Sequence, residues 1–258
     1  MQTNSIFNIK RFLLLLRNDL FRHYRMLLIG ASTVATIYFV AIIPQIIFSP
    51  ANIEQEFHIG FFPTAFIITG FLLSAGVFAE IHNTQKNTSF FMLPATIFEK
   101  FISRLLLTTI VFVPLAVVFY LALNLISLLI TKIFTGWGFP ILNPFDPDML
   151  NIMAVYLVTQ SLFIFGSSFF KKHAFMKTGV SLFTLGIILA IFAGIIFRIV
   201  YRDFFQGMVF LDHHPFSDTV AMEDFGNTLL AIIKSLFWFI LAPLCWILSY
   251  LRLSEKEV

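Results

Sequence analysis

The sequence has 258 residues, of which 59% are hydrophobic and only 12% are charged, and its formal net charge is +3. Soluble domains carry about 25% charged residues, so this composition excludes an ordinary soluble domain. The small net charge gives no indication of a nucleic-acid partner. Long stretches are apolar on every face instead of alternating, which excludes a membrane β-barrel and predicts an all-α polytopic membrane protein.

The first predicted element is an amphipathic helix over residues 7–25 that lies on the membrane surface. Its apolar positions recur at spacings of three and four, and basic residues occupy the remaining face. The apolar positions are Phe12, Leu13, Leu16, Leu20 and Tyr24, and the basic ones are Lys10, Arg11, Arg17, Arg22 and Arg25. Basic residues throughout the segment, with no cleavage site after it, exclude a signal peptide. An alternative is that these are the ordinary basic flanks of a long first span.

Six stretches are then long and apolar enough to cross a bilayer, which requires about 20 residues each. They cover residues 26–48, 59–79, 105–130, 150–170, 178–197 and 229–250. Pro44, Pro63, Pro114 and Pro243 lie within them, and neighbouring helices can satisfy the backbone groups that such prolines free. Residues 1–258 are therefore predicted to form one transmembrane domain with six transmembrane helices.

The distribution of the 17 lysines and arginines predicts the orientation of these spans. Most of them lie on the N-terminal arm, the second and fourth connections and the C-terminal tail. Because basic residues remain on the cytoplasmic side of a membrane, we expect both termini to be cytoplasmic. Residues 54, 146 and 212 then lie outside.

The second connection, residues 80–104, is the longest predicted cytoplasmic one. Thr96 is followed three residues later by Glu99, a capping box that predicts a helix beginning at Thr96 and continuing into the third span. Just before it, residues 90–93 are apolar and need a partner groove or lipid to cover them, which indicates a docking site. The alternative is that they fold back against the helix bundle.

The sequence from Leu93 through Pro94, Ala95 and Thr96 to Glu99, Lys100 and Phe101 resembles the permease subunits of ABC-2-type ATP-binding-cassette transporters. The predicted architecture resembles this family over nearly the whole chain, whereas the sequence motif covers only about 25 residues. It implies an exporter subunit in a bacterial cytoplasmic (inner) membrane, working as a homodimer or as a heterodimer with a related permease. It also implies a coupling helix that docks on a separate ABC ATPase, which binds the ATP and Mg²⁺. The coupling residues implied are Glu80, Phe90, Phe91, Met92, Leu93, Pro94, Glu99 and Lys100.

The sequence lacks the motifs of a chain that supplies its own energy for transport, which favours an energy source in another chain. No Walker loop occurs, and the central portions of the first five spans contain no ionisable residue of the kind that ion-coupled carriers retain. No catalytic motif is present, so we predict neither an enzyme nor a cofactor in this chain. His213 and His214, in the outer connection 198–228, match no zinc spacing and are interpreted as part of a solvated loop or short helices. An alternative function is a non-transporting anchor or sensor that docks a soluble partner.

Small residues mark two faces for close helix packing, because lipid provides no hydrophobic drive for helix association. Gly70 and Ser74 form such a face on the second span, and Gly186, Ala190 and Gly194 form one on the fifth. The spacing leaves open whether these faces pack within one chain or between two. A dimer interface there would supply a substrate path, which one six-helix chain with no polar lumen is not expected to enclose.

Overall fold

The computed structural model describes residues 8–48, 55–82, 95–136, 138–139, 141–200 and 219–255. Four spans are single helices: α1 (Ile9–Phe48), α2 (Gln55–Gly76), α6 (Pro147–Phe169) and α7 (Ala174–Val200). The third span comprises α4 (Ile97–Leu106), the π-turn η3 (Leu107–Val111) and α5 (Phe112–Thr135). The last comprises α9 (Thr219–Leu236), the π-turn η4 (Phe237–Leu241) and α10 (Ala242–Ser254). Six of these stretches are long and apolar enough to cross a membrane, which confirms the all-α polytopic prediction.

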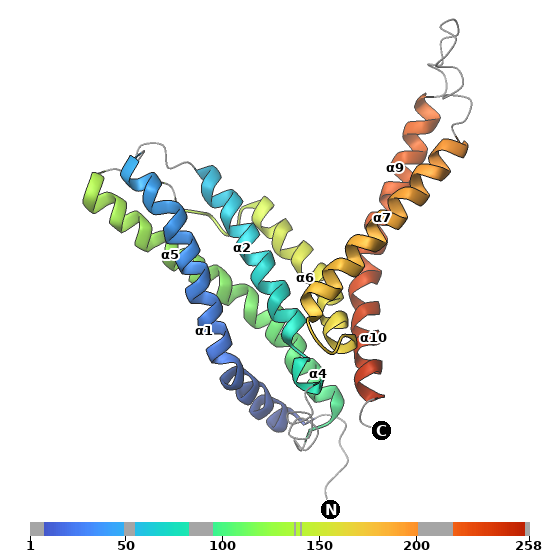
Figure 1. Ribbon diagram of the computed structural model, residues 1–258, viewed down its shortest axis with the longest axis horizontal. Coiled ribbons are helices and arrows are strands. Elements are labelled where there is room, and N and C mark those ends of the chain that lie inside the picture. Colours follow the sequence, from blue (N-terminus) through green and yellow to red (C-terminus); the bar gives the residue numbers. More distant parts are fainter. Residues whose placement is uncertain are drawn as a thin grey trace, which may run out of the picture.

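The helices form two groups that diverge from one end of the molecule (Figure 1). One group contains α1, α2, α5 and α6, and the other contains α7 with α9 and α10. The groups meet where α10 packs on α6 and α4 and where α7 contacts α6 and α2. The start of α1 and the end of α10 lie at this end (Figure 1), as an even number of spans requires, and we call it the terminal end.

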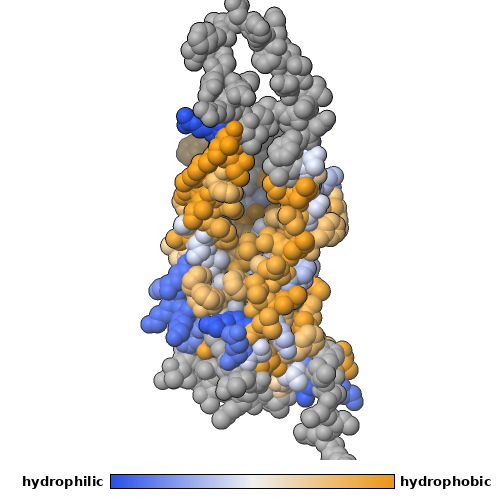
Figure 2. Space-filling model, turned by 90° about the vertical axis from the view of Figure 1, so that its right-hand side faces the viewer, coloured by the Kyte–Doolittle hydropathy of each residue, from blue (hydrophilic) through white to orange (hydrophobic). Residues whose placement is uncertain are grey.

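The main core lies within the first group and is rich in aromatic rings. Tyr38 of α1, Phe62 and Phe66 of α2, Tyr120 of α5 and Tyr156 of α6 are all buried in it. By contrast, the apolar window of α7 has no buried residue. Figure 2 faces the second group and shows mostly apolar side chains on its surface. Such a surface requires hydrocarbon or another protein around it.

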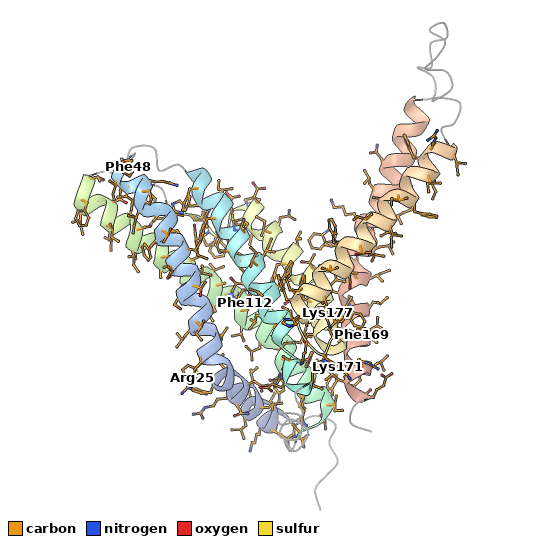
Figure 3. The ribbon with its side chains drawn as sticks, in the orientation of Figure 1. Arg25, Phe48, Phe112, Phe169, Lys171 and Lys177 are labelled. Carbon is orange, nitrogen blue, oxygen red and sulfur yellow. The ribbon has the colours of Figure 1, made fainter. Side chains whose placement is uncertain are left out.

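The N-terminal arm differs from the prediction in two respects. No boundary separates it from the first span, because α1 is one 40-residue helix that bends near Arg25 (Figure 3). Its buried residues there are Phe12, Leu15 and Asp19; Phe12 belongs to the predicted apolar face, and Leu15 and Asp19 do not. Contact with α4 selects this face, whereas Leu13 and Tyr24 of the predicted face are exposed. A position on the membrane surface remains a prediction for this arm.

The third span confirms the predicted helix start at Thr96 and ends five residues later than predicted. The helix begins after Thr96 and continues to Thr135, compared with a predicted end at residue 130. Its π-turn precedes Pro114, and the other π-turn precedes Pro243. Proline lacks a backbone donor, and local π-turns are one way in which membrane helices accommodate it.

Candidate functional site

Charged side chains from three elements meet at the terminal end and form what we call the charged cluster. Its members are Arg11 and Asp19 of α1, Glu80 of the short helix η2 (Ala79–His82), and Glu99 and Arg104 of α4. Lys100, next to Glu99 in α4, is also buried. Asp19, Glu99, Lys100 and Arg104 are each at most 2% exposed. Long charged side chains are rarely buried unless they are paired, so this burial depends on mutual compensation.

Arg104 joins α4 to both of the other elements. Its Nη2 lies 2.7 Å from Glu80 Oε2 and 3.9 Å from Asp19 Oδ1, and its Nη1 donates to the carbonyl of Val77. Ser103 Oγ donates to the other oxygen of Asp19 at 2.9 Å. Hydrogen bonds between ionised groups are stronger than neutral ones, so Arg104 fixes α1 and η2 against α4.

Glu99 makes a second junction between α1 and α4. Its Oε1 accepts from Arg11 Nη2 at 2.7 Å and from the backbone N–H of Asn8 at 2.8 Å. Its Oε2 accepts from the N–H of Thr96 at 3.1 Å, and Thr96 Oγ1 accepts from the N–H of Glu99 at 3.2 Å. The predicted capping box is therefore confirmed. The hydrogen bond to Glu99 raises the pKa of Arg11.

The charged cluster fixes both flanks of residues 83–94. On one flank, Glu80 is paired with Arg104, and His82 Nε2 lies 3.1 Å from the carbonyl of Ser167 on α6. On the other flank, Thr96 and Glu99 begin α4. Of the predicted coupling residues, Glu80 and Glu99 belong to the charged cluster, and Lys100 is buried next to Glu99 in α4. Phe90, Phe91, Met92, Leu93 and Pro94 lie outside the described residues.

Sequence reasoning missed the part that Asp19 has in this cluster. A signal was present, because Asp19 is the one acidic residue in the otherwise basic stretch 7–25.

Sequence reasoning also missed a polar group nearer the opposite end, where His58 Nδ1 lies 3.0 Å from the Tyr120 hydroxyl and 3.1 Å from Asn124 Nδ2. His58 and Asn124 are fully buried. His58 precedes the predicted span 59–79 by one residue, so the predicted bounds leave it in a connection.

The two small-residue faces have different surroundings. A Cβ on Gly70 would lie 2.7 Å from Cζ of Tyr156 on α6, and Ser74 Oγ donates to Gln160 Oε1 at 3.4 Å. The face on α2 therefore packs within the chain, which is one of the two alternatives that the spacing leaves open. On α7, nothing described lies within 4 Å of a Cβ placed at Gly186 or Gly194, and Ala190 is exposed.

Among the described residues, no group of three or more histidine, cysteine, aspartate or glutamate side chains is placed to hold a metal ion. His213 and His214 lie outside the described residues. At the terminal end, ion pairs and hydrogen bonds join α1, η2 and α4.

The cap of α4 can be tested by replacing Thr96 with alanine. The change removes the acceptor for the Glu99 N–H, and loss of such an N-cap costs about 1 kcal/mol. We expect Thr96→Ala to lower the free energy of unfolding by this amount, measured by circular dichroism during titration with a denaturing detergent. Thr96→Ser retains the acceptor, so its free energy of unfolding should equal that of the wild type. Equal loss in both variants would contradict a capping role.

Comparisons with protein-family models, with curated proteins and with solved structures found no match to this chain.

Proposed function

We propose that this chain is the membrane-spanning permease subunit of an ABC-type exporter, energised by a separate ATPase that docks on residues 80–104. The observation that supports this best is the charged cluster, which holds both flanks of residues 83–94 against α1 and α4. A partner that pushes on this segment would displace two membrane helices directly. An anchor that only holds a soluble protein does not require such a junction.

The proposed mechanism transmits ATPase closure through α4. This helix continues through η3 and α5 without a break to Thr135, so a displacement at its capped end reaches the opposite end of the span. The ATPase would bind ATP and Mg²⁺ in its own chain. Two permease chains, identical or related, would enclose the substrate path, and the α7 face at Gly186, Ala190 and Gly194 is the small-residue face still open for contact between them.

The docking surface is tested by replacing Phe91 and Leu93 with serine together. Burying a large apolar side chain contributes about 1.5 to 3 kcal/mol, so losing two should weaken association with the ATPase by roughly a hundredfold or more. The permease is purified from its native host, and the Walker-loop ATPase that co-purifies with it is quantified.

The matched control for this test is the pair Phe183 and Leu185 of α7, which has the same spacing and is exposed. Serine at these two positions should leave ATPase recovery unchanged. If the Phe91 and Leu93 variant recovered as much ATPase as wild type, the exporter proposal would fail, and a membrane anchor or sensor would replace it.

The orientation is tested by cysteine labelling of intact cells after Cys245 has been replaced by serine. Phe145 and Lys171 are exposed and lie at opposite ends of α6. The proposed cytoplasmic location of both termini predicts that a membrane-impermeant reagent modifies Phe145→Cys before lysis and Lys171→Cys only afterwards. The reverse pattern would show that the chain is inserted the other way round.

A further inference from the structure

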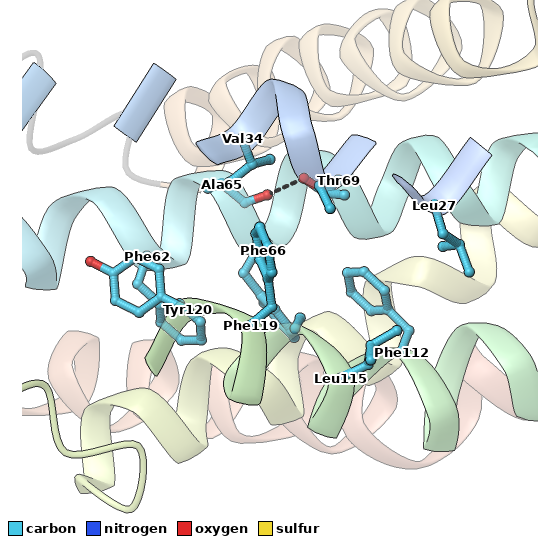
Figure 4. Close-up of a pocket in the computed structure, with 12 residues that line it drawn as sticks. Leu27, Val34, Phe62, Ala65, Phe66, Thr69, Phe112, Leu115, Phe119 and Tyr120 are labelled. Carbon is cyan, nitrogen blue, oxygen red and sulfur yellow. Dashed lines mark hydrogen bonds between the residues drawn. The ribbon is translucent and has the colours of Figure 1, made fainter. Parts of the chain in front are cut away.

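A lysine-rich turn joins α6 to α7 at the terminal end. It contains Lys171, Lys172 and His173, and Lys177 follows in the first turn of α7. The turn differs from the pocket between α1, α2 and the η3–α5 segment, because the described residues that line that pocket are apolar or uncharged (Figure 4). Selection of a partner by charge is therefore possible at the turn and not in the pocket.

The three lysines of this turn carry charge that the chain does not neutralise. All three are exposed, and within the residues that the structure describes none of them forms an ion pair. The first turn of α7 contains no acidic residue. Figure 2 shows hydrophilic side chains gathered toward the terminal end, below the apolar surface of the second group. The lysines can therefore bind an anion from outside the chain.

Two phenylalanine rings lie among these cations. Lys177 Nζ is 5.9 Å from the centroid of the Phe170 ring, and the guanidinium of Arg252 on α10 is 5.7 Å from that of Phe169. The two rings meet edge to face at 5.3 Å. Figure 3 places Phe169, Lys171 and Lys177 together where the two groups of helices meet. The end of α6, the start of α7 and α10 therefore contribute to one basic, aromatic patch.

The backbone of the turn is held in an unusual conformation. His173 has a φ of 54°, which is uncommon in residues other than glycine. Such a conformation persists where the surrounding structure imposes it, and it is found frequently at ligand-binding positions. The carbonyl of His173 accepts from the N–H of Lys177 at 3.0 Å. The chain therefore passes from α6 to α7 within residues 170–173, and the three lysines stay close to the helix ends.

Apolar side chains at the same place indicate the kind of anion. Phe169 is 52% exposed and Met176 is 63% exposed, and both lie at ends of helices that are long enough to span a membrane. A soluble anion would leave these side chains in water, whereas a lipid covers them with its acyl chains. Basic residues between the ends of membrane helices are a common site for anionic headgroups.

We propose that Lys171, Lys172 and Lys177 bind the headgroup of an anionic phospholipid in the leaflet at the terminal end, with Phe169 against its acyl chains. The lysines select the negative charge, and the exposed ring places the lipid at the helix ends. Arg252 is already paired with Glu255 at 2.7 Å and is not assigned to the headgroup. The site goes beyond the proposed function, because it requires neither an ATPase nor a transported substrate.

Native mass spectrometry of the full chain with defined lipids tests the site. Wild type, equilibrated with phosphatidylglycerol and phosphatidylcholine of identical acyl chains, should retain one phosphatidylglycerol most tightly. Each lysine near an anionic headgroup contributes about fivefold in affinity. Lys171→Gln together with Lys177→Gln should therefore reduce the preference for phosphatidylglycerol on the order of twentyfold. An unchanged preference in this variant would overturn the proposal.

The matched control removes the same charge elsewhere at the terminal end. Lys10 and Arg17 of α1 are exposed, and Lys10→Gln together with Arg17→Gln should leave the preference unchanged. An equal loss in this control would show that net charge alone attracts the lipid, and it would overturn the site. Lys171→Arg together with Lys177→Arg retains the charge and should retain the preference, which separates the loss of charge from a loss of folding.

Two further measurements on the wild-type chain identify the source of the anion. Free glycerol phosphate in large excess should not displace the bound phosphatidylglycerol, and full displacement would show a site for soluble phosphate instead of a lipid. Phosphatidylglycerol with a photoreactive group at the top of its acyl chain should label residues 169–177 more strongly than the matching phosphatidylcholine does. Equal labelling by the two lipids would overturn the proposal.

Discussion

Arg104→Ala is expected to lower the free energy of unfolding by about 3 to 5 kcal/mol, because removing one partner of a buried ion pair leaves the other charge buried without compensation. The Asp19 side chain is 2% exposed and that of Glu80 is 14% exposed. Little water can therefore reach either carboxylate to replace the lost guanidinium. The carbonyl of Val77 would also lose its donor. Detergent-induced unfolding followed by circular dichroism measures the loss.

Two comparisons separate this effect from a general cost of removing arginine. Arg104→Lys keeps the charge but has a single donor group, so we expect a smaller loss than with alanine. Arg252→Ala removes an exposed pair with Glu255 that has the same 2.7 Å separation as the Arg104–Glu80 pair, and exposed pairs contribute at most about 1 kcal/mol. Equal destabilisation by Arg104→Ala and Arg252→Ala would show that the charged cluster does not hold the helices together.

Gly70→Leu is expected to be the second most damaging single change, with a loss near the upper end of the range of about 1 to 3 kcal/mol that overpacking costs. Even a Cβ at this position would meet the ring of Tyr156, whose hydroxyl donates to the carbonyl of Thr108 at 3.0 Å. The ring would have to move, and the α2–α6 contact would open. The same unfolding titration measures the change.

Gly186→Leu is the matched control, since the space around its Cβ position is open in the described part of the chain. We expect its unfolding curve to match that of wild type in detergent. A second variant, Gly70→Leu with Tyr156→Ala, should recover part of the stability by making room. If Gly70→Leu alone behaved like Gly186→Leu, the close contact between α2 and α6 would be refuted.

The features that could be predicted from the sequence are those set by composition or by neighbours along the chain. Six spans follow from apolar length, because a bilayer imposes nearly the same requirement on every helix. The start of α4 follows from Thr96 and Glu99, because a capping box is complete within four consecutive residues.

The charged cluster could not be predicted in the same way, because its pairs join residues that are far apart in the sequence. Asp19 reaches Ser103 across 84 residues and Arg11 reaches Glu99 across 88. The charge of a residue predicts the sign of the charge on its partner, but it does not predict which residue that partner is. The α2 face shows a related limit: Gly70 and Ser74 indicate close approach, but only the position of α6 decides that the approach occurs within one chain.

The third span has a further mechanical consequence. Its 39 residues from Ile97 to Thr135 rise roughly 58 Å at 1.5 Å per residue, about twice the thickness of a hydrocarbon core of roughly 30 Å. If it behaves as a stiff rod held at its capped end, a tilt of one degree moves the far tip by roughly 1 Å. The charged cluster then acts as a pivot, and small rotations there are amplified into displacements of atomic size on the opposite side of the bilayer.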